Sequence, residues 1–317
     1  MKIHKIIIPT PYPIGDVNAY LVKGEKLSLF DVGPKTKEAL NALKEGIQEA
    51  GYKIEDVEQV VLTHHHPDHA GWVDAFPDAD IIGHEYNDHF LRRTPEFMSY
   101  RTKFYREQLR LQAVPEHYLE KIVESKEALK LYGTTPLTQF LADGDEVPGH
   151  PGLKAIYTPG HAQSHLIFMD EATKEVIGGD LLLDKVAANP LVEPPTNLST
   201  NRPKALIQQQ ESLKLLRELN ASKVYAGHGE EIVEVNELID KRLQKDQMRL
   251  NQLIKHVNQP KTVIELTMDL YPAHYKNELG LTLSKTLGYL DCLVRDELIT
   301  ESIVNGIILY SKNPQVE

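Results

Sequence analysis

The heptapeptide Thr63–His69, which reads THHHPDH, constrains this chain more than any other segment. It follows the strand-like run Val57–Leu62 and places four metal-capable side chains within six positions: His64, His66, Asp68 and His69. In a loop that leaves a strand, the first two can point to one side while the last two project toward an adjacent position, so the loop could serve two metal sites. The alternative is a polar loop that is merely rich in histidine, which the clustering of these residue types at a strand end disfavours.

The donor chemistry is restricted further by the cysteine content. Cys292 is the one cysteine of the chain, so neither an internal disulfide nor a thiolate zinc site can form. Any metal must be bound through nitrogen and oxygen, and imidazole and carboxylate are suitable donors for zinc. Cys292 lies in a helical pattern, where we expect a small buried apolar residue.

The order of elements predicts an α/β protein. Short β-rich runs closed by Pro or Gly alternate with helical spacing in the first half, which indicates a layered sheet with its working residues on loops at strand ends. From about residue 87 to residue 139 the pattern is helical, with few strand signals. After residue 235, three helical stretches and a hairpin with an Asn305-Gly306 turn resemble a winged-helix module.

With its motifs taken in chain order, the sequence resembles the metallo-β-lactamase superfamily, whose hallmark is HxHxDH. Residues 64–69 match that hallmark, and four other family motifs occur in the expected order, each after a strand-like run: Asp31 in FDVG, His161 in TPGH, Asp180 in GGD and His228 in AGHG. The match extends over roughly residues 1–235. Five motifs in order are far more specific than any one of them.

The resemblance implies a fold and a domain organisation. We expect the α/β fold of the family, a four-layer αββα metallo-β-lactamase sandwich, as a catalytic domain over residues 1–235 with a helical insertion at about 87–139. Residues 236–317 would form a small, helical, winged-helix-like C-terminal domain.

The resemblance also assigns roles to the motif residues. It implies that one metal is held by His64, His66 and His161, that a second is held by Asp68, His69 and His228, and that Asp180 bridges the two. We expect two divalent ions, with zinc as the first choice and iron or manganese as alternatives. Asp31 would support the ligand loop by hydrogen bonding without binding metal. His65 occupies a variable position of the motif and is expected to be a structural or surface residue.

Two residues are candidates for proton transfer. Asp68 would orient the attacking hydroxide while it holds a metal, and it could deliver a proton to the leaving group. His165, four residues after His161, is at a position where some family members place a histidine that touches substrate or donates a proton. A buried histidine bonded to the backbone is the alternative for His165.

The complete ligand set resembles the type II glyoxalase, lactonase and ribonuclease branches. The resemblance implies a hydrolase in which a metal-bridging hydroxide attacks an ester, thioester or lactone carbonyl of a small molecule. Phosphodiester hydrolysis of RNA is the second hypothesis, and a metal-binding interaction protein without catalysis is the third.

Charge and composition bear on the partners. The formal net charge of −11 disfavours nucleic acid and anionic membranes, and the module from Ile239 to Glu317 has ten basic and ten acidic residues where a nucleic-acid groove would be basic. We therefore expect that module to act as a packing element, as a homodimerisation element or as a lid. The first apolar run, Ile6–Ile8, is too short for a signal peptide or a membrane span, so we expect a cytoplasmic protein.

The helical insertion is expected to border the site. Its aromatic and arginine side chains could form a lid over substrate, or they could belong to an ordinary solvated helical pair. These side chains are Tyr100, Phe104, Tyr105 and Tyr118, with Arg92, Arg93, Arg101 and Arg106.

Overall fold

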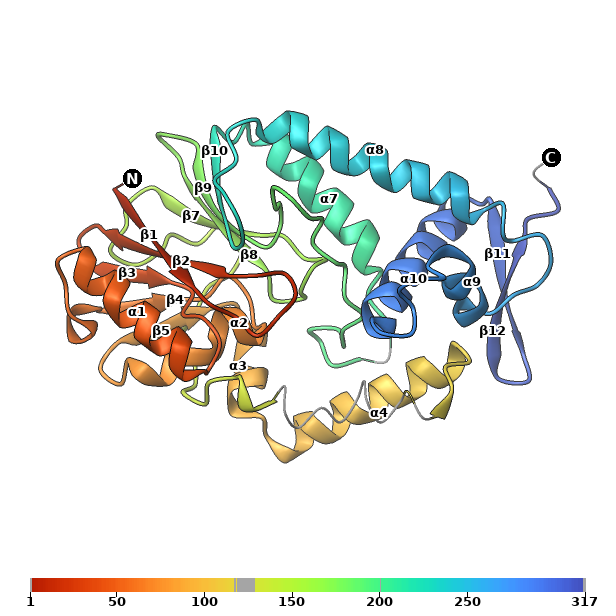
Figure 1. The fold of residues 1–317 in the computed structure, drawn as a ribbon, viewed down its shortest axis with the longest axis horizontal. Helices are drawn as coiled ribbons and strands as arrows, with labels where there is room; N and C mark the ends of the chain where they lie inside the picture. The colour runs from red at the N-terminus through yellow and green to blue at the C-terminus, as the bar shows by residue number, and fades with distance from the viewer. Residues whose placement is uncertain (1, 117, 119–128, 200, 316–317) are drawn as a thin grey trace. The chain divides into compact units, whose positions relative to one another are not determined.

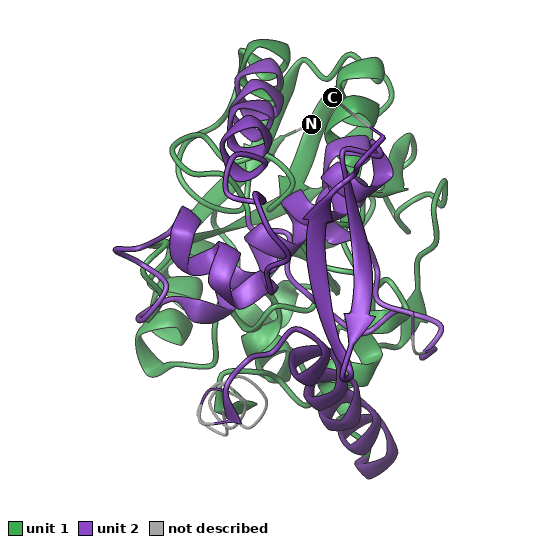
Figure 2. Ribbon diagram, turned by 90° about the vertical axis from the view of Figure 1, so that its right-hand side faces the viewer, with its two compact units in different colours: residues 1–94, 126–188, 212–239 green, residues 95–125, 189–211, 240–317 purple. Residues whose placement is uncertain are grey.

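The computed structural model describes residues 2–116, 118, 129–199 and 201–315. The chain forms two compact units, which Figure 2 shows in different colours. Unit 1 comprises Met1–Thr94, Lys126–Ala188 and Ser212–Ile239. Unit 2 comprises Pro95–Ser125, Asn189–Glu211 and Asp240–Glu317.

Unit 1 contains two β-sheets (Figure 1). The first has the order β1-β2-β3-β4-β5-β6, antiparallel from β1 to β3 and parallel from β3 to β6. Its strands are β1 (Ile3–Ile8), β2 (Val17–Lys23), β3 (Leu27–Phe30), β4 (Gln59–Val61), β5 (Asp80–Gly83) and β6 (Gln139–Phe140). The second has the order β10-β9-β8-β7, in which only the β9–β10 pair is parallel. Its strands are β7 (Leu153–Tyr157), β8 (Leu166–Asp170), β9 (Glu175–Gly179) and β10 (Lys223–Ala226).

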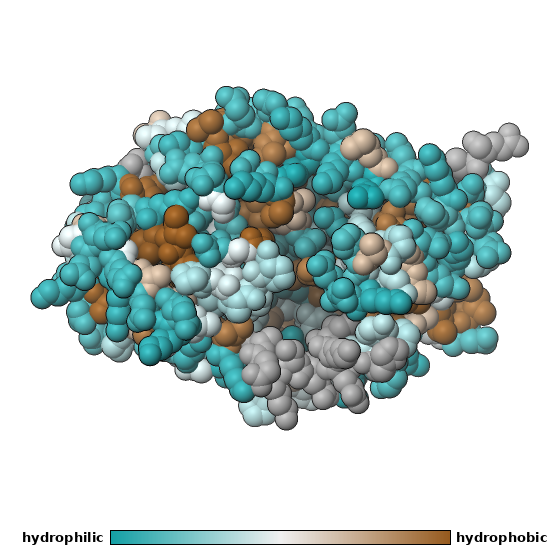
Figure 3. Space-filling view, viewed as in Figure 1, coloured by the Kyte–Doolittle hydropathy of each residue, from teal (hydrophilic) through white to brown (hydrophobic). Residues whose placement is uncertain are grey.

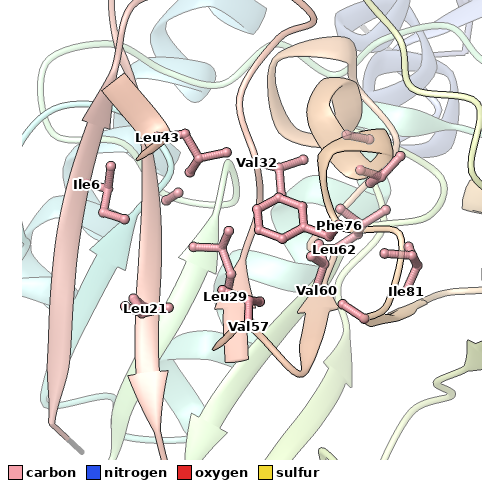
Figure 4. Packing of buried hydrophobic residues seen from close by; sticks show 14 of the residues in the cluster. Ile6, Leu21, Leu29, Val32, Leu43, Val57, Val60, Leu62, Phe76 and Ile81 are labelled. Atoms are coloured by element: carbon pink, nitrogen blue, oxygen red, sulfur yellow. The ribbon is translucent and has the colours of Figure 1, made fainter. Parts of the chain in front are cut away.

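The strands β2, β3 and β4 of the first sheet are buried on both faces, which explains why they read as nearly continuous apolar runs. Successive side chains of a strand point to opposite faces. Leu29 and Val60 pack in a cluster with Leu43 of the helix α1 (Lys37–Glu49), as Figure 4 shows. Their neighbours Phe30 and Val61 belong to a second cluster, which contains residues of both sheets. The two sheets therefore pack face to face, and α1 covers the outer face of the first.

Short helices connect the strands of unit 1. Thr36 caps α1 by accepting a hydrogen bond from the backbone N–H of Ala39. The other helices before residue 94 are η1 (Ile54–Asp56), α2 (Pro67–Ala70), η2 (Gly71–Ala75) and α3 (Tyr86–Arg92). Pro67 occupies the first turn of α2, where a missing N–H costs nothing, so the helix begins directly after His66.

Unit 2 is built mainly from helices around one apolar core. It contains α4 (Pro95–Leu111), α9 (Val263–Leu270), α10 (Leu279–Arg295) and the hairpin of β11 (Ile299–Val304) and β12 (Ile307–Lys312). Two helices, α7 (Ala205–Glu218) and α8 (Val235–Leu253), cross the boundaries between the units. Asn305 and Gly306 both have positive φ, as a two-residue hairpin turn requires. Cys292 is fully buried in this core, as the sequence predicts.

The two units divide the chain differently from the expected domains. The expected boundary at residue 235 lies close to the unit boundary at Ile239, but α4 of the expected insertion belongs to unit 2. The reason is packing, because Leu109 and Val114 lie in the same apolar cluster as Leu283 of α10. Residues 119–128 of the expected insertion lie outside the described residues. The helices and hairpin expected after residue 235 are present, and the winged-helix comparison stays a prediction.

Figure 3 shows one face of the molecule. Most of the residues visible there are hydrophilic, and hydrophobic residues occur in small separate groups. Among the described helices, none combines the length and the apolar character that a membrane span needs.

Candidate metal centre

All seven predicted ligands belong to unit 1 and lie beyond the ends of its strands. His64, His66, Asp68 and His69 follow β4, and the last two lie on the first turns of α2. His161 follows β7, Asp180 follows β9 and His228 follows β10. Loops at the carboxyl ends of strands are the usual place for functional side chains in α/β sheets, and here they bring residues of both sheets together.

Three histidines form the first group of potential ligands. Nε2 of His64 lies 3.0 Å from Nδ1 of His66, which lies 3.0 Å from Nε2 of His161. Burial, followed by the charges of neighbouring histidines, holds the pKa of His64 well below its usual range, so its imidazole is neutral and able to ligate. Three imidazole nitrogens that converge in this way could ligate one metal ion.

A second group consists of Asp68, His69 and His228, whose potential ligand atoms all lie within 4.8 Å of one another. Nε2 of His228 lies 3.5 Å from Oδ2 of Asp68. Nε2 of His69 and Nε2 of His228 are buried and have no hydrogen-bond partner among the described residues. Buried polar atoms without partners are costly, and a bound cation would satisfy both nitrogens at once.

The carboxylate of Asp180 lies between the two groups. Its Oδ2 is 3.4 Å from Nε2 of His161 in the first group and 3.6 Å from Nε2 of His228 in the second. Its Oδ1 is 3.4 Å from Nε2 of His69 and has no hydrogen-bond partner in the described part of the chain. A carboxylate in this position can contact two cations, one with each group.

The electrostatics of the cluster also fit divalent cations. Burial alone would raise the pKa of Asp180, but His228 and His69 hold it well below its usual range. Burial likewise opposes ionisation of Asp68, but the charges of His69 and His228 lower its pKa. Burial would lower the pKa of His69, yet Asp180 and Asp31 raise it well above that of an ordinary histidine. Ionised carboxylates in a buried site need positive partners, which divalent cations would supply.

Hydrogen bonds outside the two groups fix the ligand orientations. Oδ2 of Asp31 accepts from Nδ1 of His69 at 2.8 Å, and the same carboxylate accepts from the backbone N–H and the hydroxyl of Thr63, both at 2.8 Å. Nδ1 of His228 donates to the backbone carbonyl of Asp16 at 2.7 Å, which leaves Nε2 as the nitrogen that faces the site. Such partners set the tautomer and the ring orientation of metal-binding histidines.

His165 is fully buried and both of its ring nitrogens are engaged. The backbone N–H of Asp180 donates to Nε2 at 3.0 Å, so Nδ1 carries the proton and donates to the Thr158 hydroxyl at 2.8 Å. Burial and the neighbouring His161 hold the pKa of His165 well below its usual range. This geometry favours the backbone-bonded alternative over a proton donor, because neither nitrogen is directed at a substrate.

His65 is buried beside the ligand cluster, with its ring centre 5.0 Å from that of His66. Its ring stacks on Phe90 with ring centres 3.7 Å apart, and its Nδ1 lies 2.8 Å from the Ser164 hydroxyl. Ser164 also accepts a hydrogen bond from the backbone N–H of His65 at 3.1 Å. This contact joins the loop after β4 to the loop after β7, which gives His65 the structural role expected for it.

Two glycines leave room for the carboxylate. A Cβ atom on Gly227 would lie 2.2 Å from Oδ1 of Asp180, and one on Gly179 would lie 2.8 Å from Nε2 of His165. Gly179 also has a φ of 46°, which disfavours other residues. Gly179 of the GGD motif and Gly227 of the AGHG motif therefore have a steric reason.

Sequence reasoning missed the hydrogen-bond partners of the histidines in and beside the ligand cluster. Thr63, Thr158, Ser164 and the carbonyl of Asp16 are not metal-binding groups, and three of them become neighbours of a histidine only after the chain has folded. The available signal was their position, since Thr63 directly precedes the histidine run and Thr158 opens the TPGH motif.

Comparisons with known proteins agree with this geometry. Residues 12–228 match the family model described as the metallo-beta-lactamase superfamily. The probable metallo-hydrolase YqjP of Bacillus subtilis is 40% identical over 97% of this chain and 96% of its own length. A beta-lactamase-like protein 2 homolog of Caenorhabditis elegans is 25% identical over 83% of this chain and 73% of its own. A crystal structure of a metallo-beta-lactamase family protein from Thermus thermophilus is 28% identical, covers 98% of both chains and has a TM-score of 0.79.

Proposed function

This chain belongs to the metallo-beta-lactamase superfamily and is a metallo-hydrolase, and from this premise we propose that it is a dinuclear enzyme that hydrolyses a small ester, thioester or lactone. The observation that carries the proposal is the position of Asp180, whose carboxylate lies within 3.6 Å of ligand nitrogens from both groups. A single-metal site would not need a carboxylate placed between two sets of ligands.

The proposal assigns the metals as follows. His64, His66 and His161 hold one divalent cation, Asp68, His69 and His228 hold the other, and Asp180 contacts both. Zinc is proposed because every donor is an imidazole or a carboxylate. Cations bound in this way supply a nucleophile from water near neutral pH and polarise the bond that is cleaved.

Asp68 is proposed as the residue that transfers the proton to the leaving group. Its carboxylate faces Nε2 of His228, and the side chain retains 9% exposure, whereas His165 has none. Asp68 can therefore orient a water molecule for attack and later pass a proton to the leaving group. His165 instead holds the backbone of Asp180 in place, which makes it a positioning residue.

A carbonyl substrate is favoured over RNA by the surroundings of α10, the helix that would read a nucleic acid in a winged-helix domain. Its central residues Thr286–Leu293 are all buried, so they cannot enter a groove of a nucleic acid. The buried Asp291 pairs with both Arg202 and Lys204, so its carboxylate offsets one of their two positive charges. Together with the net charge of −11, this leaves no basic stripe on α10 for phosphates.

The test uses purified protein, stripped of metal by a chelator and reloaded separately with zinc, manganese or iron. Metal content is measured by elemental analysis, and hydrolysis is measured on thioesters, lactones, phosphodiesters and RNA. We expect two metals per chain and turnover of a carbonyl substrate that Asp68→Asn and His66→Ala abolish. Asp78→Asn, at an exposed position of unit 1, is the matched control and should retain full activity. Cleavage of RNA or phosphodiesters alone would overturn the proposed substrate class.

A further inference from the structure

Unit 2 contains a cavity that the metal centre does not use. Its volume is about 390 Å³, and its lining comes from α4, from the segment 191–193 and from the first turns of α10. This volume lies within the range of roughly 300–1,000 Å³ that small-molecule sites occupy. Figure 1 allows α4 and α10 to be located.

The walls of the cavity are mainly apolar. Leu109 of α4 and Leu279, Leu283 and Leu287 of α10 line it, and each of these leucines is at most 5% exposed. Val192 closes one side, where its backbone N–H donates to the hydroxyl of Ser284 at 3.3 Å. An apolar chain would bury its surface here without displacing polar partners.

One polar group in the wall lacks a partner. The guanidinium of Arg101 lies over the ring of Tyr105, 5.0 Å from the ring centre, and its Nε is buried with no hydrogen-bond acceptor among the described residues. Both residues line the cavity. A ligand that places an oxygen atom against this N–H would satisfy a donor that the protein leaves unsatisfied.

The charge of the lining argues against an anionic ligand. Arg101 is accompanied by two carboxylates, Glu193, which is 5% exposed, and Glu278, which is exposed at the start of α10. A free carboxylate or phosphate would be repelled by these acidic groups, whereas an uncharged carbonyl oxygen would not. The acceptor required by Arg101 is therefore best supplied by a neutral group.

We propose that this cavity binds an uncharged acyl compound, with its carbonyl oxygen at Nε of Arg101 and its alkyl chain among the leucines of α4 and α10. The site is a further binding site and does not depend on the hydrolytic reaction proposed above. An ester, an amide or a lactone with a medium-length alkyl chain has the required chemistry.

The structure offers a precise way to fill the cavity. Gly280 lies in α10 with helical geometry, lines the cavity, and has no heavy atom within 4 Å of the position of an added Cβ. Gly280→Leu therefore adds a large apolar side chain at the lining of the cavity without a clash at its Cβ. Ser99→Leu adds the same side chain at an exposed position of α4 that does not line the cavity, and it is the matched control.

Binding of octanamide and of sodium octanoate to the full-length protein is measured by isothermal titration calorimetry. We expect octanamide to bind at least tenfold more tightly than octanoate, and Gly280→Leu and Arg101→Leu each to weaken octanamide binding at least tenfold. Ser99→Leu should bind like the unaltered protein. Circular dichroism of each variant verifies folding. Absence of octanamide binding, equal affinity for octanoate, or unchanged binding by folded Gly280→Leu protein would each overturn the proposal.

A kinetic measurement identifies the source of the acyl chain. If the cavity holds the chain of a substrate, Gly280→Leu raises the KM for octanoyl esters and leaves acetyl esters unaffected. If it holds a separate ligand, neither KM changes while the calorimetric loss persists. Both results support the binding site, and if no ester is hydrolysed the calorimetric comparison alone decides the proposal.

Discussion

The backbone N–H of Asp180 donates to Nε2 of His165 at 3.0 Å. A histidine that is a candidate for catalysis in the sequence therefore positions the residue whose carboxylate lies between the two groups of ligands. The first prediction follows from this bond. His165→Phe keeps an aromatic ring but removes the acceptor, and it should weaken zinc binding about 10–100-fold, the usual effect of losing an outer partner of a metal site.

Zinc affinity measured by competition with a chelator provides the readout for this variant. The pH profile of kcat should keep its shape. Removal of a proton donor would abolish one limb of the profile, whereas removal of a positioning residue would not. His165→Gln, which retains an acceptor, should recover part of the affinity. A profile that loses a limb would assign proton transfer to His165.

The second prediction concerns Asp31, which links Thr63 to His69. In Asp31→Asn the amide nitrogen or oxygen must face Nδ1 of His69, and the charge that stabilises this histidine is lost. We expect the group of Asp68, His69 and His228 to lose its metal first, so that elemental analysis finds about one zinc per chain after dialysis. Two tightly held zinc ions per chain would show that Asp31 does not position His69.

The third prediction tests the space beside the bridging carboxylate. Gly227→Ala places a methyl group 2.2 Å from Oδ1 of Asp180, so Asp180 must move and both groups of ligands are disturbed. Metal content and activity should fall together by at least tenfold, as expected when a group in a metal site is displaced. Gly280→Ala, where an added Cβ meets no atom within 4 Å, is the matched control. Full activity of Gly227→Ala would exclude this steric argument.

The fourth prediction is a pH dependence of stability that arises outside the two groups of ligands. The side chain of Asp74 pairs with Lys35 and accepts hydrogen bonds from Thr134 and Thr135. Burial alone would raise its pKa, but these partners lower it from 3.8 to about 2. The lowered pKa means that Asp74 contributes stability above pH 3.8, and that this contribution is lost as the pH falls toward 2.

The full shift corresponds to about 2 kcal/mol, and screening by solvent reduces this to about 1–2 kcal/mol. Urea denaturation of Asp74→Asn should therefore show that loss in the free energy of unfolding at pH 7, and the difference from the unaltered protein should shrink as the pH approaches 2. Asp78→Asn, at an exposed position nearby in the sequence, is the control. A difference that stays constant with pH would contradict the assignment.

The sequence predicted the convergence of the seven side chains because the information is local. Each ligand follows a strand-like run, and parallel strands present their carboxyl ends at one edge of a sheet, so motif order and strand order together imply a common site. The structure places these side chains as that reasoning requires. The two neighbours of His165 could not be predicted, because Thr158 and Asp180 approach it only when β7, β8 and β9 have paired.

The division into units was beyond the sequence for a similar reason. Helical periodicity identified α4 but did not specify its partner, since Leu109 and Val114 could cover any apolar surface. Their partner is the core around Leu283, which lies far along the chain. Contacts between segments so far apart in the sequence depend on the shape and volume of the side chains that pack together. Hydrophobic periodicity carries no information on either.

The ligands come from both sheets of unit 1, with four after β4 of one sheet and three after β7, β9 and β10 of the other. Metal ions bound to all of them would act as cross-links between the two sheets. The single cysteine of the protein cannot provide a cross-link of another kind, because it cannot form an internal disulfide. Because ligands that bind only the folded chain add their binding free energy to its stability, the lifetime of this enzyme in a cell would follow the local supply of metal. Scarcity would then remove the protein itself as well as its activity.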